Sequence, residues 1–234
     1  MFSESADLYD AIYSFKDYAE EAARVAATIR SVHAGAQSIL DVACGTGEHA
    51  VRLARDHGFH VDGLDLDGGL LRVARAKHPS GSFFEADMSD FELKARYDSV
   101  LCLFSSIGYL VTLDRTRRAF ECFGRHLREE GVVLVEPWFA PGELEDGRTV
   151  RVSGLYRGRN VERVSRNEID GRISRLHFEY RIETPEGIRR ASEVHELGLF
   201  TADELAAAFE EAGLRAEFNA AGPSGRGLWI ARAN

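Results

Sequence analysis

Residues 38–47 read SILDVACGTG, a short apolar run that ends in a glycine-rich turn. A run of this length is typical of a buried strand, and glycine lets the backbone adopt conformations that a Cβ atom would forbid. The next residues, 48–58, read EHAVRLARDHG, an amphipathic helix that Gly58 closes. The stretch therefore predicts a strand, a tight turn and a helix, the beginning of a parallel α/β sheet.

The same alternation of strands and helices extends outward from this stretch. Further strands are predicted over 59–67, 81–88, 97–108 and 132–138. Helices are predicted over 17–32, 69–78 and 115–131. Because strands that alternate with helices form βαβ units, we expect an α/β fold, with a Rossmann-like, doubly wound and mostly parallel sheet.

Residues 149–200 follow a different pattern. Four runs of strand-like composition are separated by turn signals, such as Asp170–Gly171 and Pro185–Gly187. We therefore expect a small antiparallel β insertion over the active site.

The α/β pattern then returns. A helix is predicted over 201–214, where Thr201 and Glu204 form a capping-box pattern, and a last strand over 226–234.

Length and charge limit the classes of protein. At 234 residues the chain suits one domain, residues 1–234. The net charge of −9 argues against nucleic-acid or anionic-membrane partners, and no apolar run is long enough to cross a bilayer. The start, MFSESADLYD, is unlike a signal peptide, and the three cysteines lack paired or metal-type spacing. We expect a cytoplasmic protein without a metal site.

Acidic residues mark the ends of successive predicted strands. Asp65 ends the second strand, where a carboxylate can accept hydrogen bonds from both ribose hydroxyls. Asp87 and Met88 end the third, where they can hold and cover an adenine ring. Asp41 lies before the glycine turn, where it suits a zwitterionic amino-acid tail. All these groups fall at the edge where open α/β sheets bind ligands.

This order of acid, glycine turn, ribose acid and adenine acid resembles the class I S-adenosylmethionine-dependent methyltransferases, over nearly the whole chain. The resemblance implies S-adenosyl-L-methionine as cofactor and methyl transfer as the reaction. The cofactor-binding residues that we expect are Tyr18, Asp41, Ala43, Gly45, Gly47, Asp65, Leu66, Asp87, Met88 and Leu103.

Several stretches outside that core resemble nucleotide-linked amino-sugar N,N-dimethyltransferases. They read LYDAIY (8–13), KDY (16–18), FSSIG (104–108), VEPW (135–138), RVS (163–165) and GPSGRGL (222–228). The resemblance implies N-methylation of an amino sugar, a small-molecule substrate. The substrate-binding residues that it implies are Tyr13, Glu136, Pro137, Trp138, Arg163 and Arg226. The chain departs from the family pattern in its short Ser14–Phe15 segment and in having Tyr109 where the family tends to have histidine.

Arginine is concentrated in the strand-rich segment. Residues 148–190 contain eleven arginines and six acidic residues, a local net charge of about +5. Guanidinium groups pair bidentately with phosphate oxygens, so these arginines would suit a diphosphate. They equally suit the solvated face of antiparallel strands. The segment itself could line the acceptor pocket or form a homodimer interface.

A sulfonium methyl group is already activated, so orientation and desolvation can carry most of the catalysis. The catalytic candidates for orienting the amine or accepting its proton are Tyr13, Tyr109 and Glu136. His195 is flanked by a carboxylate and is a further candidate base, although we expect a hydrogen-bonded structural role for it.

Three alternatives stay open from the sequence. The acceptor could be another small amine or acid. The chain could be an NAD-dependent oxidoreductase, since Gly45, Gly47 and Ala50 satisfy the relaxed dinucleotide fingerprint; against this, the chain has no Tyr-x-x-x-Lys pair. It could also be a silent cofactor-binding subunit that regulates a partner.

Overall fold

A computed structural model describes residues 8–233 and contains two sheets. The strands of the main sheet are β1 (Ser38–Val42), β2 (His60–Asp65), β3 (Phe83–Glu85), β4 (Tyr97–Cys102), β5 (Leu127–Val135), β10 (Leu214–Asn219) and β11 (Leu228–Ala233). Their order is β10-β11-β5-β4-β1-β2-β3. Strands β1 to β5 are parallel, whereas β11 pairs antiparallel with both β5 and β10. The predicted doubly wound, mostly parallel sheet is confirmed.

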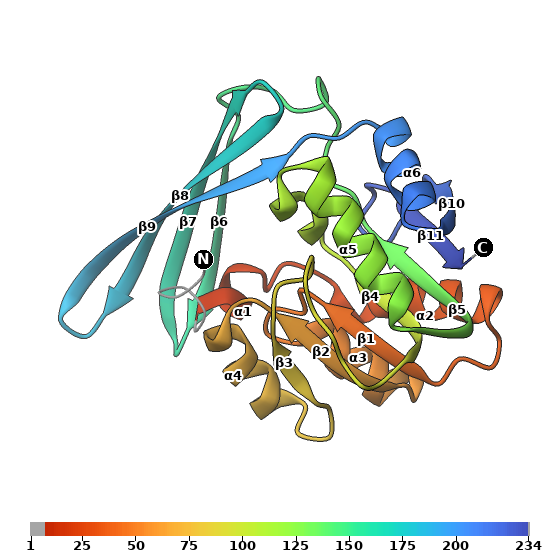
Figure 1. Ribbon diagram of the computed structural model, residues 1–234. Coiled ribbons are helices and arrows are strands. Elements are labelled where there is room, and N and C mark those ends of the chain that lie inside the picture. The colour runs from red at the N-terminus through yellow and green to blue at the C-terminus, as the bar shows by residue number, and fades with distance from the viewer. Residues whose placement is uncertain (1–7, 234) are drawn as a thin grey trace.

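Helices cover both faces of the main sheet (Figure 1). They are α1 (Tyr9–Ile12), α2 (Tyr18–Val32), α3 (Glu48–His57), α4 (Gly68–Lys77), α5 (Leu113–Arg125) and α6 (Ala202–Glu211), with a 3-10 helix, η2 (Ser106–Leu110). In β4, Val100 and Cys102 pack with residues of α5 and α6, whereas Leu101 packs with residues of α2 and α3. Because successive side chains of a strand face opposite sides, helices on both faces bury every residue of β1 and β4.

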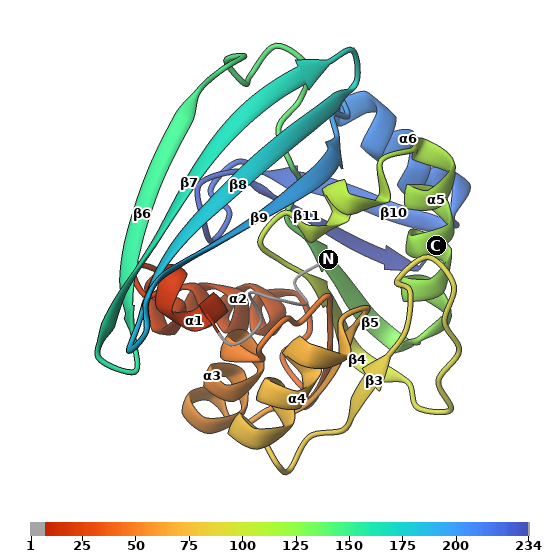
Figure 2. The same cartoon turned by 90° about the vertical axis from the view of Figure 1, so that its left-hand side faces the viewer.

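The second sheet consists of β6 (Thr149–Tyr156), β7 (Arg159–Asp170), β8 (Ile173–Thr184) and β9 (Gly187–Gly198). Each strand pairs antiparallel with the next, so the predicted antiparallel insertion is confirmed. Figures 1 and 2 show this sheet standing beside the main sheet, with α1 against its lower end. On its inner face, Val161, Phe178 and Tyr180 pack with Leu8 and Ile12 of the α1 region.

Local signals at the ends of helices are also confirmed. The Thr201 hydroxyl accepts a hydrogen bond from the Glu204 backbone N–H, and the Glu204 carboxylate accepts one from the Thr201 N–H, which completes a capping box. Gly58 ends α3 in a left-handed conformation, with φ +76°.

Three predicted boundaries are wrong. The strand predicted over 97–108 ends at Cys102, because Phe104 and Ser105 have φ of +52° and +60° and turn the chain into η2. The helix predicted over 115–131 ends at Arg125, and the following residues open β5. The helix predicted over 201–214 ends at Glu211, and Leu214 begins β10, a strand for which no prediction was made. Of residues 8–233, no helix is long and apolar enough to span a membrane.

Candidate active site

A cavity of about 710 Å³ lies between the carboxyl ends of the parallel strands and the inner face of the second sheet. The main sheet and its loops line one side with Ala43, Gly45, Asp65, Leu66, Asp87 and Met88. The second sheet lines the other with Val152, Arg163, Phe178 and Leu197. Between the two lie Tyr9, Tyr13, Lys16, Tyr109, Trp138 and Arg226. The cavity therefore collects most of the residues that the sequence predicts for both sides.

The glycine turn after β1 is held by Asp65. The Asp65 carboxylate accepts hydrogen bonds from the backbone N–H of Gly45 at 2.8 Å and of Asp67 at 2.9 Å. Burial nevertheless raises the pKa of Asp65 above its ordinary value. Gly47 lines neither this cavity nor the smaller one beside it. Its φ is +76°, and a Cβ there would lie 3.1 Å from the Ala74 Cβ, so its role is to let α3 start close to α4.

Asp41 is a buried acid whose hydrogen bonding is incomplete. Its side chain is 2% exposed, and its Oδ2 atom has no hydrogen-bond partner among the described residues. Burial raises the pKa of Asp41 to about 6. Tyr18, Leu103 and His49 join Asp41 around a small cavity of about 30 Å³ next to the main one. A buried carboxylate oxygen without a partner is what the ammonium group of a bound amino acid would complete.

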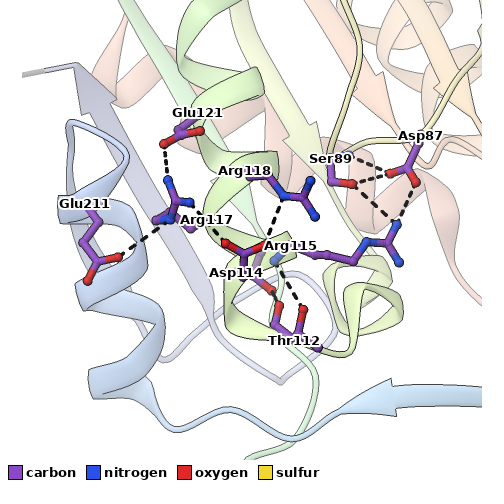
Figure 3. A network of polar contacts seen from close by, with 10 residues as sticks. Asp87, Ser89, Thr112, Asp114, Arg115, Arg117, Arg118, Glu121 and Glu211 are labelled. Carbon is purple, nitrogen blue, oxygen red and sulfur yellow. Dashed lines mark hydrogen bonds and ion pairs between the residues drawn. The ribbon is translucent and has the colours of Figure 1, made fainter.

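Asp87 is anchored on three sides. Its Oδ1 accepts hydrogen bonds from the Ser89 N–H at 2.8 Å and hydroxyl at 2.7 Å, and its Oδ2 pairs with Arg115 at 2.7 Å. Figure 3 shows Arg115 reaching Asp87 from the start of α5, while Arg117 and Arg118 pair elsewhere. Burial acts to raise the pKa of Asp87, but these contacts hold it below its ordinary value.

A chain of charged groups borders the cavity near α2. Lys16 forms a 3.0 Å ion pair with Glu21, and Glu21 contacts the His49 Nε2 at 2.9 Å. The Lys16 ammonium also lies 3.6 Å from the centre of the Phe104 ring. Burial lowers the pKa of Lys16. Burial acts to raise the pKa of Glu21, but His49 and Lys16 hold it below its ordinary value.

The acceptor side is built on a buried arginine. Arg163 is 7% exposed, and its Nη1 donates a hydrogen bond to the Tyr13 hydroxyl at 2.6 Å. Its guanidinium lies between the rings of Tyr13 and Phe178, at 4.9 and 4.5 Å from their centres. The Arg163 Nε and the Trp138 Nε1 are buried donors with no partner among residues 8–233. The orphaned groups on this side are therefore donors, suited to oxygen atoms of a ligand.

Glu136 lies behind the cavity wall. It is 2% exposed, and its carboxylate accepts hydrogen bonds from the Phe104 N–H at 2.8 Å and from the Ser224 hydroxyl. The Arg226 guanidinium lies 3.7 Å from the same carboxylate. Burial raises the pKa of Glu136. Its oxygens hold Phe104, Ser224 and Arg226, and Glu136 is not among the residues that line the cavity, so its contact with the amine stays a prediction from the sequence.

Pro137 and Arg226 complete this wall. The Pro137 carbonyl accepts a hydrogen bond from the Ser105 hydroxyl at 2.6 Å, so Pro137 supports the wall rather than lining it. The Arg226 guanidinium stacks 5.3 Å from the ring centre of Trp138.

Tyr109, in η2, contacts His195, in β9 of the second sheet. The Tyr109 hydroxyl lies 2.9 Å from the His195 Nδ1, and the His195 Nε2 lies 3.2 Å from Glu193. Tyr109 lines the cavity, whereas His195 is buried behind it. The expected hydrogen-bonded state of His195 is confirmed, and its partner is one of the predicted catalytic residues.

The arginine-rich segment divides between the two faces of the second sheet. Arg148 and Arg163 line the cavity. On the outer face, Arg175 pairs with Glu196 at 2.7 Å and with Asp170 at 2.8 Å. Most of the local positive charge therefore serves the solvated face, and two arginines remain for a ligand.

Sequence reasoning missed several cavity residues. Tyr9 lines the cavity next to Tyr13, one helical turn away, and this i, i+4 spacing could have been noticed within LYDAIY. Arg115 pairs with Asp87, and Lys16 pairs with Glu21. No local sequence pattern predicts either pair.

Comparisons with known proteins agree with this geometry. A family model described as a methyltransferase domain matches residues 39–131, the segment that carries the glycine turn and its acids. A dTDP-3-amino-3,4,6-trideoxy-alpha-D-glucopyranose N,N-dimethyltransferase of Streptomyces venezuelae is 40% identical over 230 residues, 97% of each chain. The chain belongs to the S-adenosylmethionine-dependent methyltransferases.

Solved structures extend the likeness of this methyltransferase to the second sheet. The crystal structure of DesVI from Streptomyces venezuelae matches with a TM-score of 0.92 and 39% identity, over 99% of each chain. CalS10, an amino pentose methyltransferase from Micromonospora echinaspora solved with S-adenosylmethionine bound, matches with a TM-score of 0.86 and 36% identity, over 97% of each chain. The methyltransferase uses S-adenosylmethionine as its cofactor, and the oxidoreductase alternative falls.

Proposed function

We propose that this methyltransferase transfers methyl groups from S-adenosylmethionine to the amino group of a nucleotide-linked deoxy sugar. The observation that carries the proposal is the 40% identity with a sugar N,N-dimethyltransferase over 97% of both chains. Such an alignment includes the second sheet, which lines the cavity opposite the cofactor residues. A match confined to residues 39–131 would have supported the cofactor alone.

The cofactor side is proposed to use the strand-end acids. The orphaned Asp41 Oδ2 would accept a hydrogen bond from the α-ammonium group, with Tyr18 and Leu103 beside it. Asp65 and Leu66 would hold the ribose, and Asp87 and Met88 the adenine. Leu66 is 60% exposed although it lines the cavity, so a bound ring would cover it. Ala43 and Gly45 would form the backbone wall beneath the sulfonium.

The acceptor side is proposed to orient the amine with Tyr13 and Tyr109, whose side chains line the cavity. Arg163, Trp138 and Arg226 would bind oxygen atoms of the sugar nucleotide. Glu136 and Pro137 would act indirectly, because they hold the residues that form the wall.

Catalysis is proposed to depend mainly on placement. When bound, S-adenosylmethionine supplies a methyl group that is already activated by its positive sulfur. The residues of the cavity then need to hold a neutral amine about 3–3.5 Å from that carbon and to exclude water. The rings of Tyr9, Tyr13 and Phe178 supply apolar walls for this purpose.

The deciding experiment incubates the protein with S-adenosylmethionine and a dTDP-3-amino-3,6-dideoxy sugar and measures the product by mass spectrometry. We expect product with one and then two added methyl groups. The 4-amino isomer is run in parallel, to find which position of the amine fits the cavity. Binding of S-adenosylhomocysteine without methylation of either sugar would leave a methyltransferase of another small amine or acid.

Two control measurements accompany the assay. Calorimetric titration should give micromolar binding of S-adenosylhomocysteine and none of NADH. Tyr13→Phe and Tyr109→Phe should each slow turnover; if both left it unchanged, their assignment as catalytic residues would be wrong.

The single-domain organisation, the homodimer and the cytoplasmic location stay predictions, and sedimentation velocity would test the dimer.

A further inference from the structure

A buried polar path leads from the cavity into the second sheet. It begins at Tyr109, one of the residues that line the cavity, whose hydroxyl lies 2.9 Å from the His195 Nδ1. It continues from the His195 Nε2 to the Glu193 carboxylate at 3.2 Å. His195 is only 1% exposed, so its ring reaches solvent through neither face of the sheet. The position next to Gly108 is also where this chain departs from its family's pattern.

Local sequence brings these three groups together. Residues 193 and 195 lie on the same face of β9 because side chains alternate along a strand; between them, Val194 is 57% exposed on the other face. Gly108 allows η2 to approach β9, since a Cβ there would lie 3.0 Å from the Trp138 Cβ and 3.1 Å from a Leu197 methyl carbon. Tyr109 therefore reaches His195 because its neighbour has no side chain.

The pairing assigns the direction of the hydrogen bonds. A carboxylate only accepts hydrogen bonds, so the His195 Nε2 carries a proton and donates it to Glu193. In the neutral imidazole the Nδ1 is then an acceptor, and the Tyr109 hydroxyl donates to it. The Tyr109 oxygen then keeps its capacity to accept a hydrogen bond.

The surroundings keep Tyr109 protonated between turnovers. Besides His195, the groups that act most strongly on the pKa of Tyr109 are Tyr13 from the end of α1, Arg163 from β7, Tyr180 from β8 and Glu193 from β9. Burial raises the pKa of Tyr109 well above its ordinary value, and of these neighbours only Arg163 acts to lower it. The Phe178 ring lies 4.7 Å from the His195 ring and covers it.

We propose that Tyr109, His195 and Glu193 form a proton relay that removes the proton from the acceptor before each methyl transfer. This inference rests on the proposed transfer to an amine. An aliphatic amine enters the site mostly protonated at neutral pH. Its N–H proton passes to the Tyr109 oxygen as the Tyr109 hydroxyl proton passes to the His195 Nδ1. The resulting imidazolium is paired with the Glu193 carboxylate.

The amine lone pair, freed in this way, forms the new bond to the methyl carbon, and the electrons of the carbon–sulfur bond leave with sulfur. When the product leaves, the proton now on the Tyr109 oxygen passes to water as the proton on the His195 Nδ1 passes back to that oxygen. Tyr109 is the catalytic residue of the relay, and His195 and Glu193 are positioning residues that act through it. Two methyl transfers use the same path twice, because the first transfer turns the amine into an ammonium group that must lose a proton before the second.

The test compares the pH dependence of kcat in the wild type, Tyr109→Phe, His195→Gln and the double variant. At pH 7 we expect each single variant to lose about 10²-fold in kcat, with the double variant no worse than either. The loss in kcat should shrink as the pH rises, because more of the amine is then already deprotonated in solution when it binds. The affinity for S-adenosylhomocysteine should stay within about twofold of wild type, which a misfolded variant would not achieve.

His177→Gln is the matched control. His177 lies on the neighbouring strand β8 and pairs with Glu168 at 2.8 Å, but on the outer face of the sheet and away from the cavity. The pH dependence of kcat in His177→Gln should follow that of wild type. Single variants whose losses multiply in the double variant, or a loss that is equal at all pH values, would overturn the relay in favour of a purely structural network.

Nitrogen NMR of His195 tests the relay without any acceptor. We expect the tautomer with its proton on Nε2, and a shift of the Nδ1 resonance in Tyr109→Phe. A proton on Nδ1 would reverse the hydrogen bond to Tyr109 and overturn the relay, whatever the acceptor is. Absence of methylation in wild type would instead refute the proposed function, so the two failures are distinguishable.

Discussion

The two sides of the cavity hold their polar groups in different ways. On the cofactor side, Asp65 and Asp87 accept hydrogen bonds from backbone N–H groups within a few residues of the strand ends or from the turn beside them. On the acceptor side, side chains hold side chains: Tyr13 with Arg163, 150 residues apart, and Tyr109 with His195, 86 residues apart. The cofactor side is therefore fixed by the fold, and the acceptor side by particular pairs of residues.

This difference indicates which side of the cavity tolerates substitution. A backbone donor is present whatever the residue, so the cofactor side tolerates substitution around it as long as the acid stays. A side-chain pair is lost when either partner changes, and the buried group left behind then costs about 1–3 kcal/mol. We expect substitutions on the acceptor side to alter turnover while the cofactor still binds.

The largest expected effect is on the cofactor side. Asp65→Ala removes the acceptor for the N–H groups of Gly45 and Asp67 and the proposed ribose contact. We expect the affinity for S-adenosylhomocysteine to fall by at least about 10²-fold in a calorimetric titration, since each hydrogen bond to a charged group contributes about 1.5–3 kcal/mol. Asp56→Ala, an acid of α3 paired with Arg55 at the surface, is the control. Unchanged binding in Asp65→Ala would remove Asp65 from the site.

The next effect separates the two sides. Arg163→Met removes the buried guanidinium between Tyr13 and Phe178, and we expect kcat/KM for the amino sugar to fall by about 10- to 10²-fold. Affinity for S-adenosylhomocysteine should stay within about twofold. Arg175→Met, on the outer face of the same sheet, should change neither quantity. A parallel loss of cofactor affinity in Arg163→Met would break the distinction between the sides.

A smaller effect concerns Asp41, whose Oδ2 has no hydrogen-bond partner within the described part of the chain. Asp41→Asn should weaken binding of S-adenosylhomocysteine by about tenfold, because it removes a charge from the proposed ammonium contact. In wild type the affinity should fall as the pH drops through about 6, where Asp41 takes up a proton. Titrations between pH 5 and 8, a range chosen around that pKa, should find this fall in wild type and not in Asp41→Asn.

Asp41→Asn should also raise thermal stability of the cofactor-free protein. The pKa of Asp41 is raised by folding to about 6, so the folded state binds its proton more tightly than the unfolded state does. Stability from this group is present below its unfolded pKa and is lost as the pH rises through about 6. Above that pH the variant should gain roughly 3 kcal/mol, and the gain should vanish in acid. Equal Tm values at pH 8 would contradict an uncompensated buried charge.

The smallest effect is expected at Arg115. Arg115→Ala removes one partner of Asp87 and leaves the Ser89 N–H and hydroxyl, so affinity for S-adenosylhomocysteine should fall only about threefold. Arg118→Ala is the control, because Arg118 lies three residues further along α5 and pairs with Asp114 instead. A loss as large as that of Asp65→Ala would mean that a side-chain pair, rather than the backbone, fixes this acid.

Local sequence patterns predicted the features that depend on near neighbours. The strand–turn–helix around Gly45, the cap at Gly58 and the capping box at Thr201 each arise within a few residues. The positions of Asp41, Asp65 and Asp87 followed from the rule that parallel strands end at one edge, so their meeting at the cavity edge could be predicted too.

Features that depend on distant or weak signals could not be predicted. Strand β10 reads LRAEFN; its apolar–polar alternation covers only six residues, most of them exposed at the edge of the sheet, and it begins three residues after α6, so the signal is weak. Helix α5 was predicted too long because the following REE run has helical propensity, although Glu130 turns the chain with φ +63°. The pairs of Arg163 with Tyr13 and of Arg115 with Asp87 join distant segments that no local pattern links.

The order of strands has a consequence for how the molecule assembles. The second sheet pairs each strand with its neighbour in the sequence, so it can form hairpin by hairpin over short loops. In the main sheet, β11 lies between β5 and β10 and joins residues about a hundred positions apart. We expect hydrogen-exchange labelling during refolding to protect β7 and β8 before β11, so that the cavity is completed only when Arg226, next to β11, is in place.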